Sequence, residues 1–118
     1  MKYNSFKCCS NNIALEIPKE LIEEVSNSLI VEDNNNKGKR IDLKKLADFN
    51  NSEVDTVTFD MYAASPLAVT ENNIPKDTKV KVIISILSLS NGIYEEIFIN
   101  DNCLMVIDAN HVLGYMVK

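Results

Sequence analysis

The dipeptide Asn91-Gly92 constrains the fold of this chain more than any other feature, because it separates two runs rich in β-branched residues, 79–90 and 93–99. A two-residue type I′ turn needs positive φ at both central positions, and Asn-Gly is well suited to it. With that turn, Ile86 faces Ile97, and a slip of one residue would separate the apolar pairs. The sequence therefore predicts a long β-hairpin near the C-terminus.

More strands are predicted on either side of this hairpin. Residues 103–107 and 112–117 are apolar runs that would extend it into a C-terminal β-meander. Residues 54–61 alternate apolar and polar side chains, as a half-buried strand does. After the break at 63–66, residues 67–70 are predicted to resume as an edge or bulged strand.

The first fifty residues contain the predicted helices. A short strand, 13–17, is followed by Pro18, which is well placed at the first position of a helix. Apolar residues then recur at helical spacing, which predicts an amphipathic helix over 18–29. Residues 34–40 read as a loop, and 42–48 as a second short helix capped by Asp42.

The predicted fold class is therefore α+β. One or two N-terminal helices would pack on an antiparallel sheet of five to six strands that ends in a C-terminal β-meander. The length of 118 residues predicts a single domain, with a mainly helical part over 1–50 and a β-rich part over 54–118.

The predicted hairpin is apolar on both faces, whereas a sheet with one wet face should alternate. Its reverse face would hold large apolar side chains that we expect to form an interface: Ile83, Leu87, Leu89, Tyr94 and Phe98. The helices can cover roughly one face only. The other face is closed either by residues 54–70 folding over it or by another chain, and the sequence leaves both possibilities open.

Charge and composition limit the classes of partner. The net charge is −5, and residues 51–118 hold the whole excess, with four Lys or Arg against nine Asp or Glu. This acidic half repels phosphate backbones, so nucleic acid is an unfavourable partner for it. The N-terminus does not resemble a signal peptide, no apolar run is long enough for a membrane span, and the three cysteines are an odd count. We therefore expect a cytoplasmic protein, or a virion protein if a phage encodes it.

The sequence predicts no catalytic residue, no metal site and no cofactor. The three glycines do not form either of the common phosphate-binding loops. The adjacent cysteines Cys8 and Cys9 lack the spacing of a zinc site, and Cys103 and His111 are too far apart along a strand to form a nucleophilic pair. Any enzyme would have to rely on hydroxyls and on carboxylates such as those of Asp60 or Asp108.

Residues 13–46 carry a resemblance to a known family. The order of strand, I-P-x-E-L segment and possible hairpin LIVED-NNNKGK-RIDL resembles the swapped-hairpin transcription factors of the AbrB type. The resemblance implies a dimer that presents basic residues to DNA. Lys37, Lys39 and Arg40 are the matching basic residues in this chain.

These observations favour a non-enzymatic protein-interaction or assembly module whose partner is another protein or a second copy. Residues 62–82 are similar in style to phage virion accessory proteins, so a phage or mobile-element protein is predicted. It would act as a virion accessory protein or as an acidic inhibitor or immunity protein. The alternatives are an AbrB-like DNA-binding regulator and a small-ligand-binding β-barrel.

Overall fold

The computed structural model describes residues 6–24, 39–41, 55–76, 80–99 and 102–117. The strands in these ranges are β1 (Asn12–Ile17), β2 (Ile22–Glu24), β3 (Lys39–Ile41), β4 (Thr56–Ala64), β5 (Val80–Ser85), β6 (Tyr94–Ile99), β7 (Asn102–Asp108) and β8 (Val112–Val117). The helices are α2 (Pro66–Asn72) and α3 (Ile86–Ser90), with single 3-10 turns η1 (Lys19–Leu21) and η2 (Ala109–His111).

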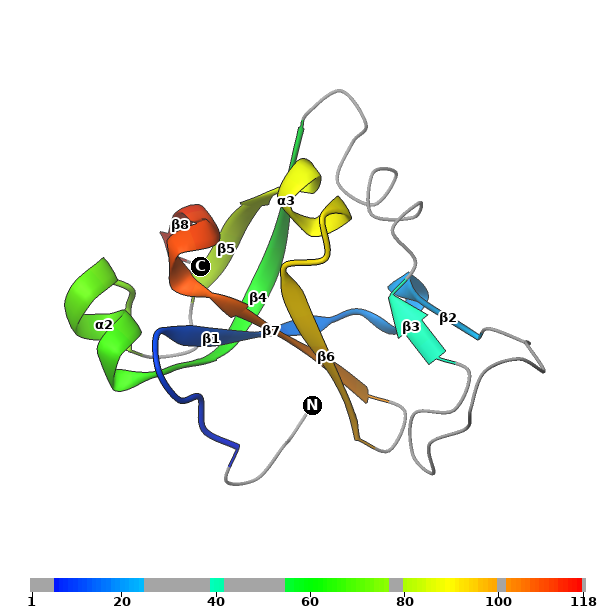
Figure 1. Ribbon diagram of the computed structural model, residues 1–118, viewed down its shortest axis with the longest axis horizontal. Helices are drawn as coiled ribbons and strands as arrows, with labels where there is room; N and C mark the ends of the chain where they lie inside the picture. Colours follow the sequence, from blue (N-terminus) through cyan, green and yellow to red (C-terminus); the bar gives the residue numbers. More distant parts are fainter. Residues whose placement is uncertain (1–5, 25–38, 42–54, 77–79, 100–101, 118) are drawn as a thin grey trace.

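Six of the strands form one antiparallel sheet in the order β6-β7-β1-β4-β5-β8, and β2 pairs separately with β3 (Figure 1). The α+β class and the size of the sheet are thus confirmed. The N-terminal helices are not. After Pro18 the chain makes only η1 and then enters β2. The remainder of predicted helix 18–29, from residue 25, and predicted helix 42–48 lie outside the described residues.

The predicted hairpin is wrong. β5 ends at Ser85, and the next five residues form α3. Within one helical turn Ile86 and Leu89, three positions apart, both face the core, where Leu89 is fully buried. Gly92 has the predicted positive φ, 71°, but Asn91 has φ −84°, so the dipeptide terminates a helix. The N–H of Gly92 donates to the carbonyl of Leu89 (3.0 Å).

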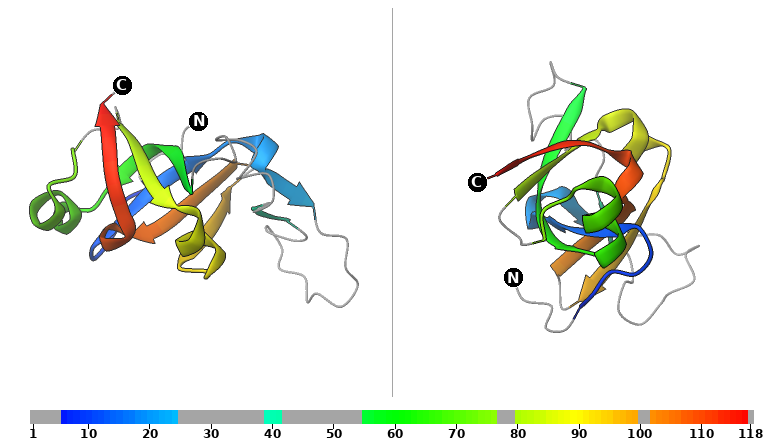
Figure 2. Two further views of the ribbon diagram at one scale, coloured as in Figure 1. Left: turned by 90° about the horizontal axis from the view of Figure 1, so that it is seen from above. Right: turned by 90° about the vertical axis from the view of Figure 1, so that its left-hand side faces the viewer.

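The predicted meander is also wrong in its pairing. β6 pairs with β7, as consecutive strands often do, but β8 follows η2 across to the opposite edge of the sheet and pairs with β5. Strand pairing of this kind depends on contacts far apart in sequence, which local patterns do not encode. Figure 2 (left) shows β8 running along the outer side of β5.

Residues 67–70 form part of α2 instead of a strand. Ser65 is the N-cap, and its hydroxyl oxygen accepts a hydrogen bond from the N–H of Ala68 (3.1 Å). Pro66 occupies the first helical position, where its missing N–H has no intrahelical partner to lose. Ala68 is fully buried and fixes the helix against the sheet.

One face of the curved sheet holds the main core. The predicted inward residues of β4, namely Val57, Phe59 and Met61, are all buried, which confirms the alternation read from the sequence. Matching residues come from β1, β5 and β7, and α3 adds Leu89.

The opposite, outer face is covered in part by the segment before β1. Phe6 and Cys8 pack there against Ala14 and Leu104, which are both fully buried. Closure of this face by residues 54–70 was one of the two possibilities left open by the sequence. β4 is a central strand of the sheet itself, so it does not fold over this face. The β5–β8 end of the sheet lies away from this cluster.

Candidate functional site

The free edge of β8 is the most unusual surface of the described chain. The strand contains no charged residue, and β5 is its only neighbour among the described strands. Four of its side chains are exposed: Leu113 (63%), Tyr115 (41%), Met116 (49%) and Val117 (72%). Edge strands of soluble proteins usually carry charges, prolines or bulges that block further pairing.

The register with β5 assigns these side chains to the two faces of the sheet. Tyr115 and Val117 lie opposite the buried Val82 and Val80, so they continue the core face outward. Met116 lies opposite Lys81 on the outer face. The strand edge is therefore apolar on both faces, and an added strand would find apolar neighbours on each face.

A groove of about 320 Å³ runs beside the first half of β8. It is lined by α2, the segment that follows it, η2 and β8 through Asn72, Ile74, Ala109, Asn110, Val112, Leu113, Gly114 and Tyr115. Two hydrogen bonds fix its walls. The amide nitrogen of Asn72 donates to Oδ1 of Asn110 (3.2 Å), and the hydroxyl of Tyr115 donates to the carbonyl of Asn73 (3.2 Å). The groove is thus a built feature that extends the edge toward Leu113.

The turn before β8 is also well defined. The carboxylate of Asp108 accepts hydrogen bonds from the N–H of Asn110 (2.8 Å) and from the side-chain amide of Asn11 (3.2 Å). His111 is the last residue of η2. These contacts hold the start of β8 in place, so the edge is presented by a fixed scaffold.

The five residues predicted as an interface do not share a face. Leu89 and Phe98 belong to the buried core, and Leu87 is 70% exposed on α3. The remaining two, Ile83 and Tyr94, are half-buried on β5 and β6, which do not pair with each other. The prediction that these side chains share one surface depended on the incorrect hairpin. The structure therefore does not support an interface formed by these five residues.

The residues predicted for DNA binding are only partly described. Lys37 lies outside the described residues, whereas Lys39 and Arg40 belong to β3. The antiparallel register places these two positions opposite Glu24 and Glu23 of β2. Residues 29–33, the first arm of the hairpin that the AbrB resemblance implies, lie outside the described residues. The strand that pairs with β3 is β2, and this pairing sets each basic position opposite an acidic one.

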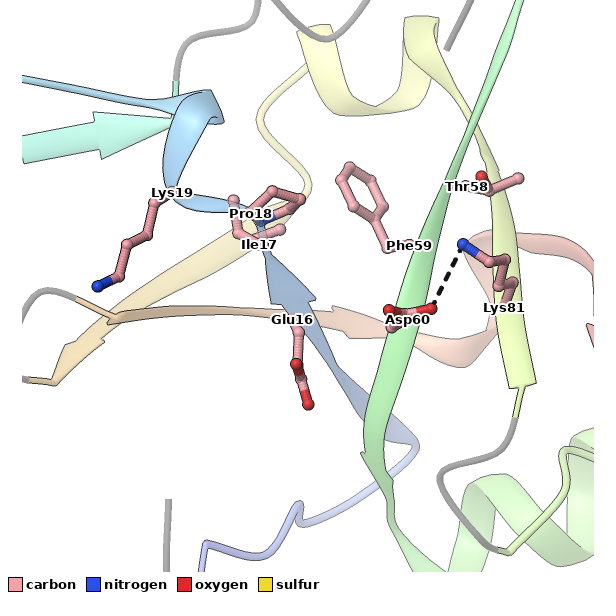
Figure 3. Close-up of a pocket in the computed structure, with 8 residues that line it drawn as sticks. All are labelled: Glu16, Ile17, Pro18, Lys19, Thr58, Phe59, Asp60 and Lys81. Atoms are coloured by element: carbon pink, nitrogen blue, oxygen red, sulfur yellow. Dashed lines mark ion pairs between the residues drawn. The ribbon is translucent and has the colours of Figure 1, made fainter. Parts of the chain in front are cut away.

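A second hollow, of about 240 Å³, lies where β1, β4 and β5 meet (Figure 3). Glu16 and Asp60 are register partners there, and Lys81 forms an ion pair with Asp60 at 3.5 Å. Lys19 also lines the hollow but extends away from Asp60. Both members of the Lys81–Asp60 pair are more than 40% exposed, so solvent screens their interaction. The two acidic and two basic side chains that line this hollow carry no net charge together.

The two buried thiols, those of Cys8 and Cys103, are poorly suited to nucleophilic chemistry. Burial, with a smaller contribution from Cys9, raises the pKa of the Cys8 thiol to about 11. Burial, with a smaller contribution from the charge of Glu96, raises the pKa of Cys103 to about 12. Both thiols are therefore protonated at neutral pH, and the thiolate is the reactive form. Within the described ranges, no three His, Cys, Asp or Glu side chains gather as a metal site would require.

Comparison with protein-family models, with curated proteins and with solved structures finds no match to this chain. The helices in the described ranges are all too short or too polar to cross a membrane. Residues 112–117 are recognisable in the sequence as an uncharged run and are predicted as the last strand of a meander, beside 103–107. The structure pairs this strand with β5 instead, and that neighbour depends on a strand order that local patterns do not contain.

Proposed function

We propose that this protein is a non-enzymatic assembly module that binds another polypeptide along the free edge of β8 by strand addition. The supporting observation is an edge strand of six residues with no charge and four exposed apolar side chains. In such binding, main-chain hydrogen bonds supply affinity and alternate side chains supply specificity.

The two edges of the sheet differ in a way that supports this proposal. β6, at the far edge, contains the charged residues Glu95 and Glu96. The carboxylate of Glu96 accepts a hydrogen bond from the N–H of Ile41 at the end of β3 (2.7 Å), so this edge already has a neighbour. Acidic residues on an edge strand disfavour pairing with other chains. Only β8 combines an apolar edge with the absence of charge within the described sheet.

Burial of the β8 side chains provides the driving force. Full burial of a large aliphatic side chain is worth about 1.5–3 kcal/mol. Leu113, Met116 and Val117 expose about half or more of their surface, so covering them contributes about 1 kcal/mol or more each. Together with new main-chain hydrogen bonds, this is enough for a specific but reversible contact.

The proposal is tested by selecting short extended peptides from a random library on the wild-type protein and locating where they bind. We expect Val117→Lys to weaken the selected peptides by about tenfold or more, because it places a charge on the edge. Leu87→Lys is the matched control, since Leu87 is equally exposed but lies on α3. Peptides that bind both variants as tightly as the wild type would show that β8 is not the binding edge.

A DNA-binding role through residues 13–46 is the second candidate. It is supported by part of the order that the AbrB resemblance implies: a strand, β1, is followed by the Ile17-Pro18 segment and the short helical turn η1. The implied hairpin arm 29–33 lies outside the described residues. Its signature would be duplex binding that weakens steeply with salt and is abolished by charge reversal at Lys37, Lys39 and Arg40. An absence of binding at low salt would remove this candidate. The phage or mobile-element setting stays a prediction.

A further inference from the structure

We infer that the polypeptide bound at the β8 edge is a second copy of this chain, paired antiparallel about a two-fold axis that passes beside Tyr115. This inference rests on the proposed function and names its partner. It follows from the charge around the edge, from the register that a two-fold axis permits, and from the space above Gly114.

Charge is the first consideration, because the chain as a whole is acidic, with a net charge of −5. Two copies therefore repel except where their facing surfaces are uncharged. Across β5 and β8 the only charged side chain is Lys81, and Asp60 neutralises it. Among the described residues of these two strands, an acidic or basic partner would find no complementary charge, whereas an identical uncharged edge fits them.

The charge on β5 stays apart from its own copy in such a dimer. The two copies of Lys81 would be separated by three strand spacings, or about 14 Å at about 4.8 Å each. Salt at physiological strength screens exposed charges beyond about 8 Å. The dimer thus keeps the two Lys81 side chains out of effective contact.

The symmetry of an antiparallel pair limits the register. Residues directly opposite each other point to the same face of a sheet, so a two-fold axis normal to the sheet must pass beside a residue that faces its own copy. With Tyr115 in that position, Gly114 of one copy faces Met116 of the other, and both belong to the outer face.

Gly114 favours this register over registers in which the two-fold axis passes beside another residue of β8. A Cβ at Gly114 would meet nothing within 4 Å, so the space over this residue is open. In the proposed dimer the Met116 side chain of the second copy fills that space. Glycine inside a strand often marks a place where another chain approaches closely. On the core face the two Tyr115 rings become cross-strand neighbours, which is a favourable aromatic pair.

Engineered disulfides test the register directly. In a Cys9→Ser background, which removes the exposed thiol, Tyr115→Cys places two thiols opposite each other. Directly opposed residues have Cα atoms about 4.5–5.5 Å apart, within the range a disulfide spans. Val117→Cys is the control, because its two copies would be displaced by four positions, or about 13 Å. Cys8 and Cys103 are buried in both proteins.

We expect mild oxidation to convert Tyr115→Cys to a covalent dimer and to leave Val117→Cys monomeric. Equal cross-linking of the two variants, or cross-linking of neither, would overturn the inference. Its failure is distinct from failure of the proposed function. If no Tyr115→Cys dimer forms while the selected peptides still lose affinity for Val117→Lys, the edge binds a different chain and only the second copy is wrong.

Discussion

The two leucines of α3 provide a sharp test of the fold. Leu89 and Leu87 are two residues apart in a five-residue helix, but Leu89 is fully buried and Leu87 is 70% exposed. In a continuous strand they would share one face, because side chains alternate with a period of two. In a helical turn they point in different directions. The same substitution at both positions therefore distinguishes the two structures.

We expect Leu89→Ala to reduce the free energy of unfolding by about 2–5 kcal/mol. That is the range for removing a buried leucine, which loses transfer free energy and leaves a cavity. Leu87→Ala should change the free energy of unfolding by no more than about 0.5 kcal/mol, as exposed substitutions usually do. Urea denaturation followed by circular dichroism measures both values, with an unchanged dependence on urea as the check that the comparison is valid.

The result that would refute this reasoning is similar destabilisation by the two substitutions. Equal large effects would place both leucines in a core, as a strand buried on that face requires. Equal small effects would remove Leu89 from the core and α3 from the fold.

Three further predictions concern local structure. Ser65→Ala should lower the free energy of unfolding by about 1–2 kcal/mol in the same urea assay, because it removes the N-cap of α2 and the hydrogen bond that the hydroxyl donates to the carbonyl of Ser10. Ser90→Ala, at an exposed position, is the control. Gly92→Ala should cost about 1–2 kcal/mol because Gly92 has a φ of 71°, whereas stability unchanged by this substitution would contradict the helix-ending geometry. Cys8 and Cys103 have pKa values of about 11 and about 12 in the folded protein, above the ordinary 9.0 that they regain on unfolding, so the unfolded chain releases these protons first. Their contribution to stability is complete below pH 9 and is lost as the pH rises toward 11 and 12. When urea denaturation is repeated across this pH range, the free energy of unfolding should fall less steeply with pH in Cys103→Ala than in the wild type.

The strands that the sequence predicts well are those with a strong local pattern. β4 alternates cleanly, and β1 is a short apolar run that becomes a central strand with both faces largely covered. β7 and β8 were also located within one residue of their ends. For these elements, residue type and spacing are sufficient because the side chains themselves determine which face is buried.

The errors arose where one local signal fits two structures. Asn91-Gly92 suits a tight hairpin turn, but glycine at positive φ also ends helices, and the apolar spacing of Ile86 and Leu89 decides between them. The β-branched composition before it favoured a strand, although strand preference depends strongly on context. α2 was predictable from Ser65-Pro66, since a serine N-cap followed by proline is a common helix start.

The candidate site could not be predicted in full for a different reason. Residues 112–117 are recognisably apolar and uncharged, but exposure depends on which strand lies beside them. β8 pairs with β5, about thirty positions earlier in the chain, and no other described strand covers its free side. A sequence pattern reports the chemistry of a strand, whereas its position in the sheet is a property of the whole fold.

The solution mass by light scattering, measured on the wild type, Val117→Lys and Leu87→Lys, is the most direct test of association through β8. We expect the wild type and Leu87→Lys to approach twice the 13.3 kDa of one chain as concentration rises, and Val117→Lys to remain at 13.3 kDa. A wild type that stays at 13.3 kDa at every concentration, or a Val117→Lys variant that associates as well as Leu87→Lys, would contradict this account.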